Sequence, residues 1–293
     1  MITILRKELA DYFTSIRCFI LFLLVLLAST GGLYAAYQGI RGAVSETGFV
    51  FLKLFTTSGE VMPSLVSFIA LFVPIIGIVL GFDAINSERS SGTLNRILSQ
   101  PVYRDSVING KFLAGMVTLS IMMAATMLIV SGYGLRMIGV PPTAEEIIRL
   151  FIYLVSIIIY GAFWIGLAIL FSILFRKIAV SLLASIAVWL FFGFFYTLMI
   201  APAVATSAEM YLMLIRFSPS ALFDQATTVL LLPIVRSLGM ITQAQAAYMI
   251  PNPLSLTQSV LLIWPHLTAL ISLTAICFAI SYVVFMRQEI RAT

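Results

Sequence analysis

Long apolar segments separated by shorter polar stretches dominate the pattern of this 293-residue chain. Six of the segments are long enough to cross a bilayer, since a spanning helix needs about 20 mostly apolar residues. Their approximate bounds are 18–40, 61–82, 111–135, 149–175, 178–200 and 263–286. The pattern therefore predicts an all-α integral membrane protein with six transmembrane helices.

The segment that precedes the first span, 1–17, is amphipathic. Apolar residues recur in it at helical spacing, with Arg6, Lys7 and Glu8 between them. Such a helix is expected to lie in the membrane interface. A cleaved signal peptide is the alternative, but its charged start would lack the acids seen here, and the apolar run is longer than that of a signal.

Two loops are long. The first, 83–110, is polar and contains a short helical pattern that Pro101 ends. The second, 201–262, lies between the fifth and sixth spans and is still quite apolar, with prolines that divide it into short pieces. We expect short helices in it at 220–232 and 242–249. The apolar surface of such a loop is expected to be covered by the outer mouth of the bundle, by a second subunit or by another protein.

Composition supports the membrane assignment. Hydrophobic residues make up 61% of the chain and charged residues 10%, and the mean hydropathy is +1.09. Soluble domains are about 25% charged, so a soluble protein is excluded, and so is a disordered one. The chain reads as one transmembrane domain, 1–293, without a separate soluble domain.

The distribution of basic residues predicts the orientation. With the N-terminus on one side, that side holds eleven Lys and Arg residues and the other side holds six. The positive-inside rule then places both termini in the cytoplasm, 83–110 inside and 201–262 outside. The net charge of +5 is thus explained by topology rather than by nucleic-acid binding. We expect a multi-pass protein of the plasma membrane, in contact with lipid.

The span cores contain no Asp, Glu, Lys, Arg or His. Ion-driven carriers need such groups inside the membrane, and an intramembrane hydrolase needs carboxylates or a Ser/His pair. His266 is the only histidine and stands near the outer interface. Methionines crowd the third span, and their thioethers would suit copper(I), but flexible packing is the favoured interpretation because we expect no Cys or His nearby. We predict no catalytic residues and no metal site.

A nucleotide-binding motif is also missing. The only Gly-Lys pair is Gly110-Lys111, and both the earlier glycine and the following Ser or Thr of a P-loop are replaced, by Asp105 and Phe112. The chain is therefore not predicted to be an enzyme. If ATP drives its activity, another chain binds the ATP.

Small residues on the second span suggest close helix packing. Gly77 and Gly81 form a Gly-x-x-x-Gly pair, which lets two helix backbones approach closely, and Pro74 before them can kink the helix. We expect these three residues to form a hinge or a packing surface, and the pattern is compatible with a dimer.

Two groups of residues form a pattern, one near the N-terminus and one around the first long loop. The first group is Arg6, Lys7, Glu8 and Leu9. The second group is Asp83, Ala84, Ile85, Glu88, Gly92, Thr93, Leu94, Leu98, Pro101, Arg104, Gly110, Lys111 and Phe112. With these residues the chain resembles the permease subunits of the ABC type 2 exporter class, in particular its NosY-like branch. The six-span layout extends the resemblance over the whole chain. The loop 201–262 carries no motif that distinguishes one branch of the class from another.

The resemblance implies a coupling helix at 88–100 that docks on a separate ABC ATPase. Its docking residues would be Glu88, Arg89, Gly92, Thr93, Leu94, Ile97, Leu98, Pro101 and Arg104. The segment 1–17 would be an elbow helix beside it, where Arg6, Lys7 and Glu8 make polar contacts. Two ATPase copies would bind ATP and Mg²⁺, and this chain, which binds no cofactor, would pair with itself or with a related permease.

Two functions are compatible with the sequence. The first is the membrane subunit of an ATP-powered exporter with an apolar or amphipathic substrate, because no charged group lines a span. The alternative is a NosY-like mechanotransmission subunit. It would pass ATP-driven motion through 201–262 to an extracytoplasmic partner in metal-site assembly.

Overall fold

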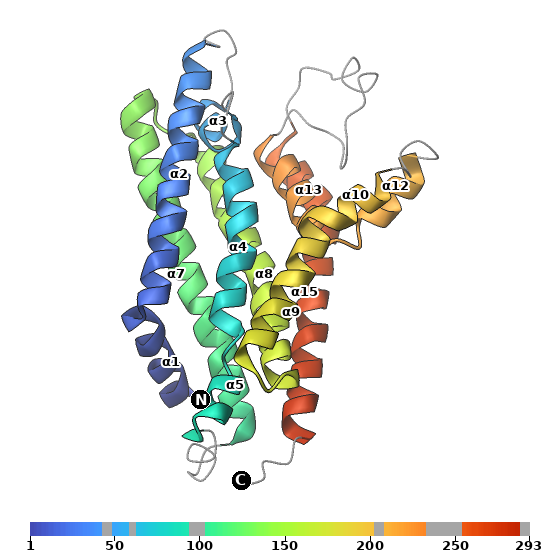
Figure 1. Cartoon of the computed structure of the whole chain (residues 1–293). Helices are drawn as coiled ribbons and strands as arrows, with labels where there is room; N and C mark the ends of the chain where they lie inside the picture. The colour runs from blue at the N-terminus through green and yellow to red at the C-terminus, as the bar shows by residue number, and fades with distance from the viewer. Residues whose placement is uncertain (43–48, 59–62, 94–102, 202–207, 233–253, 288–293) are drawn as a thin grey trace.

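The fold is a bundle of long helices. The structure is a computed structural model that describes residues 1–42, 49–58, 63–93, 103–201, 208–232 and 254–287. Six helices in it are long and apolar enough to cross a membrane, and no strand occurs among the described residues (Figure 1). The predicted fold class is confirmed.

The spans correspond to α2 (Ile16–Gly42), α4 (Leu65–Gly81), α7 (Arg104–Ile138), α8 (Ala144–Leu174), the run α9 (Ile178–Leu190), η1 (Phe191–Phe195) and α10 (Tyr196–Ile200), and α15 (Leu256–Arg287). The shorter helices are α1 (Ile2–Thr14), α3 (Val50–Thr56), α5 (Asn86–Ser90), α12 (Ala208–Ile215) and α13 (Pro219–Leu231). The helix expected at 220–232 is thus present as α13, and 242–249 lies outside the described residues.

Several bounds differ from the predicted ones for physical reasons. The predicted elbow helix 1–17 ends early, because Ser15 is extended (ψ 127°) and separates α1 from α2. The spans α7, α8 and α15 extend beyond their apolar cores, because polar turns continue the helices outside the hydrocarbon region. Thr143 and Glu146 form a capping box that fixes the start of α8.

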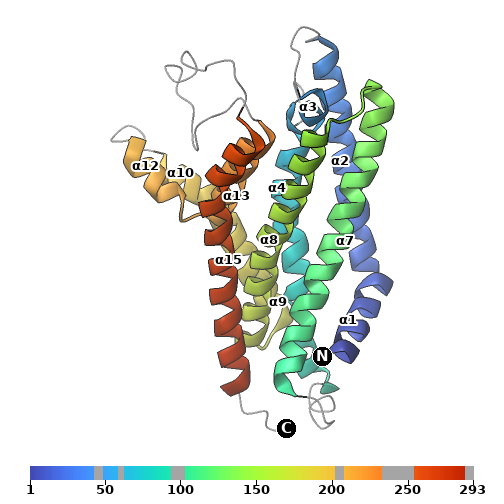
Figure 2. The same cartoon turned by 180° about the vertical axis from the view of Figure 1, so that it is seen from behind.

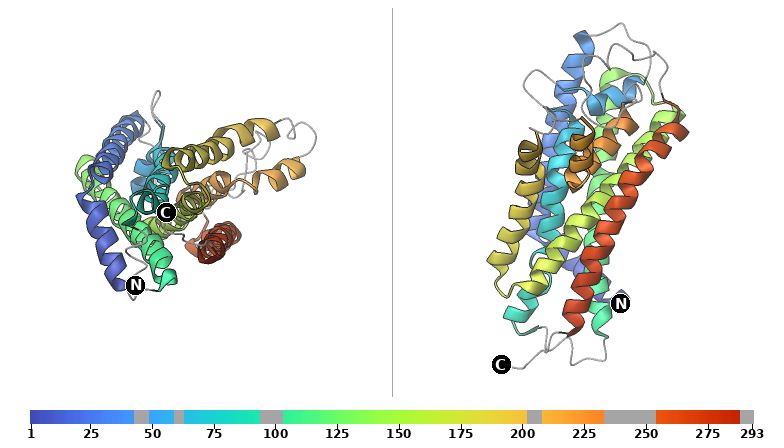
Figure 3. Two further views of the ribbon diagram at one scale, coloured as in Figure 1. Left: turned by 60° about the horizontal axis from the view of Figure 1, so that its bottom comes forward. Right: turned by 90° about the vertical axis from the view of Figure 1, so that its right-hand side faces the viewer.

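The central helix is α8. It is surrounded by α4, α7, α9, α13 and α15, as seen along the bundle (Figure 3). In its most apolar window 78% of the residues are buried, against 11% for the α9 run and 17% for α15. The α9 run and α15 are therefore the peripheral spans, which offer their apolar sides to lipid or to a second chain.

The helices α4 and α8 touch through glycine. A Cβ on Gly77 would come within 2.8 Å of the Trp164 Cβ, and one on Gly81 within 2.9 Å of the Ile165 carbonyl oxygen. The close approach that this Gly-x-x-x-Gly pair permits is thus to α8 of the same chain. Pro74 lies within α4, one turn before Gly77.

The N-terminus and the end of α15 lie at the same end of the bundle, and α3, α13 and the start of α15 lie at the other (Figures 1 and 2). We refer to these as the inner and outer ends, following the predicted orientation. The inner end also holds α5 and the start of α7, and α1 packs across α7 there. The helices α10 and α12 project sideways from the outer half.

A fully buried arginine organises the outer end. The Arg149 guanidinium donates to the carbonyl oxygens of Leu230 (2.8 Å) and Leu254 (2.7 Å) and to the hydroxyl of Ser259 (3.0 Å). It also pairs with Glu145 at 2.8 Å. One side chain of α8 therefore holds the end of α13 and the start of α15 together.

We expect Gly81→Ala to destabilise the protein by about 1–3 kcal/mol, because the new methyl group meets backbone atoms of α8 that cannot yield. The control is Gly132→Ala on α7, where a Cβ would meet nothing within 4 Å. Thermal unfolding in detergent should show a lower midpoint for Gly81→Ala only. Equal midpoints for the two variants would contradict the close packing of α4 on α8.

Candidate functional site

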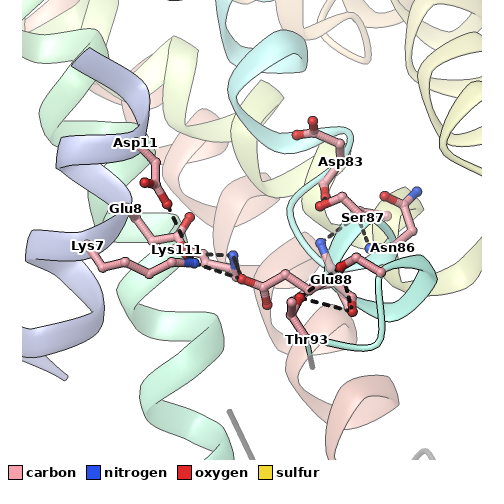
Figure 4. Close-up of polar contacts among 12 residues, drawn as sticks. Lys7, Glu8, Asp11, Asp83, Asn86, Ser87, Glu88, Thr93 and Lys111 are labelled. Carbon is pink, nitrogen blue, oxygen red and sulfur yellow. Dashed lines mark hydrogen bonds and ion pairs between the residues drawn. The ribbon is translucent and has the colours of Figure 1, made fainter. Parts of the chain in front are cut away.

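Four charged residues from three segments meet at the inner end (Figure 4). We call Lys7, Glu8, Glu88 and Lys111 the inner charge cluster. The buried Lys111 ammonium lies 2.8 Å from Glu8 Oε1 and 2.9 Å from Glu88 Oε1. The half-exposed Lys7 ammonium lies 3.0 and 3.1 Å from the same two oxygens. Each carboxylate oxygen is thus shared by two ammonium groups, and the cluster joins α1, α5 and α7.

Packing of α1 brings Glu8 to the cluster. Gly110 precedes Lys111 on α7, and a Cβ there would lie 2.9 Å from Ile4 Cγ2, so the absence of a side chain lets α1 approach. The Tyr12 hydroxyl donates to the carbonyl oxygen of Leu80 (2.6 Å) at the end of α4. At the start of α2, Arg17 pairs with Asp83 at 2.9 Å. The segment 1–17 is therefore bound to the inner ends of α4 and α7.

The start of the loop 83–110 is bound to α8 and α9 as well. The Ser172 hydroxyl oxygen, near the end of α8, accepts from the backbone N–H groups of Ile85 (2.9 Å) and Asn86 (3.1 Å). The Ser181 hydroxyl of α9 donates to the carbonyl oxygen of Phe82 (2.8 Å). These bonds lie on both sides of the short α8–α9 turn at Arg176 and Lys177, so the loop begins as an extension of the bundle rather than as a free connector.

The cluster favours the ionised carboxylate. Burial alone would raise the pKa of Glu8, but the charges and hydrogen bonds of Lys111 and Lys7 outweigh it and hold the pKa below its usual value. The pKa of Lys7 is raised, since its bonds to Glu8 and Glu88 outweigh the opposing effect of burial. Both shifts show that the charged forms stabilise one another at neutral pH.

The predicted coupling helix 88–100 needs correction. Glu88 belongs to α5, which ends at Ser90, and the chain then turns at Ser91 and Gly92. Gly92 has φ +71°, a left-handed conformation that glycine adopts without strain and that interrupts an α-helix. A single continuous helix over 88–100 is therefore wrong, because the helix that holds Glu88 ends at Ser90 and the chain turns at Ser91 and Gly92; 94–100 lies outside the described residues.

The Glu88 carboxylate also points elsewhere than expected. It was predicted on the ATPase-docking surface, but Glu88 is 8% exposed and its carboxylate faces Lys7 and Lys111. Thr93 is exposed at the surface, with Gly92 before it. Arg89 is half-buried on α5, and Arg104 is the first residue of α7. Leu94, Ile97, Leu98 and Pro101 lie outside the described residues.

Of the predicted elbow residues, Lys7 and Glu8 are in the cluster and Arg6 is exposed. The sequence marks Lys111 only as a residue of the family motif and does not predict its ion pairs. Its position at the start of a long apolar helix was the available signal, because a lysine there must find carboxylates or reach water.

The methionines of α7 have one neighbour that the sequence hid. The Cys18 thiol lies 3.8 Å from the Met122 sulfur, although 104 residues separate them. The prediction that no cysteine lies near these thioethers is therefore wrong for Met122. Among the described residues, no group of three His, Cys, Asp or Glu side chains is arranged to hold a metal ion.

Comparison with known proteins gives the family. Residues 2–290 match the family described as ABC-2 family transporter protein. This chain belongs to the ABC-2 family of transporter proteins. It is also similar to the probable ABC transporter permease protein NosY of Pseudomonas aeruginosa, with 30% identity over 182 residues. That match covers 61% of this chain and 58% of the NosY chain, so just over half of the relative is represented. The resemblance to ABC permease subunits is confirmed.

We expect Lys111→Met to destabilise the protein by about 3–5 kcal/mol, because it leaves two carboxylates in a buried site with one ammonium. The triple variant Glu8→Gln, Glu88→Gln, Lys111→Met should recover most of that loss, since no buried charge remains unpaired. Denaturant titration in mixed micelles measures both.

Lys177→Met is the matched control, since it removes an exposed lysine from the same end. It should change the free energy of unfolding by less than about 0.5 kcal/mol. An equally small effect of Lys111→Met would show that the cluster contributes little to stability.

Proposed function

We propose that this chain is the permease subunit of an ATP-powered ABC exporter, and that it couples ATP hydrolysis in a separate ATPase to the movement of an apolar or amphipathic substrate. Membership of the ABC-2 family supports a membrane permease subunit of an ABC transporter. The observation that carries the coupling proposal is the inner charge cluster, because it fixes the loop that follows α4 to α1 and α7.

In this proposal the surface that follows Gly92 contacts the ATPase, and Glu88 acts behind it. Thr93 lies on that surface, and Arg89 and Arg104 flank it. Glu88 positions the loop through Lys7 and Lys111 instead of touching the ATPase. A loop held by ion pairs to two helices transmits a push to the bundle, whereas a loop attached only by its backbone would absorb it.

The other partners follow from the ABC arrangement. Two ATPase copies would dock at the inner end and bind ATP and Mg²⁺, and two permease chains would face one another in the plasma membrane with their termini in the cytoplasm. The peripheral α9 run is a suitable face for the second permease, since Phe195, Leu198 and Met199 are 58%, 70% and 69% exposed. A homodimer is the simplest form of this assembly.

Leu94→Asp should abolish docking of the ATPase. Leu94 is selected from the apolar pattern of the loop, and a carboxylate there would have to be desolvated against the partner. We expect co-purification of the ATPase with the variant to fall by at least about tenfold. The control is Val140→Asp, which places the same charge on an exposed residue beyond the far end of α7. Undiminished co-purification with Leu94→Asp, or equal loss in both variants, would contradict the docking surface.

A second candidate function is a mechanotransmission subunit that drives an extracytoplasmic partner. Two observations favour it: the 30% identity to the NosY permease, and the apolar surface of α12 and the turn that follows it, where Met213 and Phe217 are 69% and 70% exposed. The partner would bind 201–262 and receive the motion of the bundle.

This alternative predicts that Met213→Asp with Phe217→Asp removes the partner while the ATPase remains bound. The two changes add charge to a surface that the bundle does not cover, so folding should be retained. Affinity purification with the ATPase as bait distinguishes the outcomes. Loss of the ATPase together with the partner, or no partner at any stage, would count against mechanotransmission.

A further inference from the structure

The outer half of the bundle contains a cavity of about 350 Å³ between α4, η1 and α13. A second hollow of about 290 Å³ lies on the other side of η1, against α12. Gly193, Ser220, Asp224 and Thr228 line both. The larger cavity has the size of a small-molecule site. Asp224, one turn after Ser220 on α13, stands between the two.

Asp224 is a carboxylate without a counter-charge. It faces the cavity from α13, and within the described ranges no hydrogen bond or ion pair reaches its carboxylate. Asp224 is exposed to the hollows that it lines, so its carboxylate carries its charge at neutral pH. An unpaired carboxylate in the wall of a cavity whose other lining residues are uncharged attracts a cation that enters the cavity.

The other walls of the cavity are aromatic and hydroxylic. Trp189 and Phe194 lie edge to face, with ring centroids 6.0 Å apart. Thr227 is 1% exposed, and its hydroxyl has no hydrogen-bond partner among the described residues. The segment η1, which carries Phe194, is a π-helix, a local deviation that is frequent at functional sites.

These groups select the chemistry of the ligand. Divalent metal ions require about six oxygen ligands, and the cavity offers a single carboxylate. Indole and phenyl faces attract organic cations and also accept their apolar parts. The hydroxyl groups of Ser220 and Thr228 in the wall offer polar contacts.

We propose that this cavity binds an organic monocation with an apolar body, with its charge against Asp224 and its body against Trp189 and Phe194. One part of this proposal rests on the proposed function, namely that the bound cation is the substrate that the exporter moves. It refines the expected apolar or amphipathic substrate. The charge that the spans lack is supplied by α13, which comes from the loop 201–262 and packs against α4 and α8.

The probe for this site is tetraphenylphosphonium, and the readout is saturable binding to the purified full chain in nanodiscs of neutral lipid. Two compounds of similar shape control for the apolar body: the anion tetraphenylborate and the neutral triphenylphosphine oxide. We expect the cation to bind in excess over empty nanodiscs and the other two compounds to show no saturable binding.

Asp224→Asn should weaken binding of the cation by at least about tenfold, and Asp224→Glu should restore part of it. Asp105→Asn, which removes a carboxylate from the inner end, is the matched control and should bind as the original chain does. If Asp224→Asn does not give a folded chain, Trp189→Leu replaces it and should also weaken the cation.

Equal binding of cation and anion, or undiminished binding by folded Asp224→Asn or by Trp189→Leu, would overturn the proposal. The measurement uses the permease alone, so it does not depend on the ATPase. Failure of Leu94→Asp to disturb the ATPase would overturn the proposed docking and leave the cation site standing. Failure of the cation to bind would overturn the cation site and would not affect the proposed docking of the ATPase.

Discussion

Burial of one ammonium group, that of Lys111, determines the inner end of the molecule. An ammonium with 4% exposure is tolerable only if carboxylates surround it, and Glu8 and Glu88 provide them from α1 and α5. Because each carboxylate would in turn be costly without its lysines, the three segments must assemble together. The interfacial helix, the loop after α4 and the start of α7 therefore form one unit, although more than a hundred residues separate its ends in the chain.

The outer end is assembled by a different kind of contact. Arg149 is also fully buried, but two of its acceptors are backbone carbonyl oxygens, those of Leu230 and Leu254, which carry no net charge. Between the two ends α4 and α8 are in glycine-mediated contact. At its inner end α8 binds the loop through Ser172, and further out the Tyr160 hydroxyl donates to Ser220 of α13 at 3.0 Å. A single packed pair of helices thus connects the loop with the wall of the cavity.

The sequence predicts those features that local rules determine. Six spans and an interfacial helix follow from segment length and helical spacing, and both are present. The start of α13 is also predicted well, because Ser218 and Pro219 are ordinary helix-start residues. The inner charge cluster was only partly predictable, since pairing of Lys111 with Glu8 depends on how distant helices pack. The inward direction of Glu88 and the break at Gly92 depend on the same packing. Asp224 was missed as a binding group because its segment was assigned to an outer loop.

The π-helix η1 has a geometric effect on the helix that follows it. A π-turn contains about one residue more than an α-turn, and one residue corresponds to about 100° of rotation about the helix axis. The face of α10 is therefore rotated by roughly that angle relative to an uninterrupted continuation of α9. In this rotated position the Tyr196 hydroxyl donates to the carbonyl oxygen of Leu214 (2.6 Å) and holds α12 alongside. One additional residue in a helical turn thus sets the direction in which the outermost helices leave the bundle.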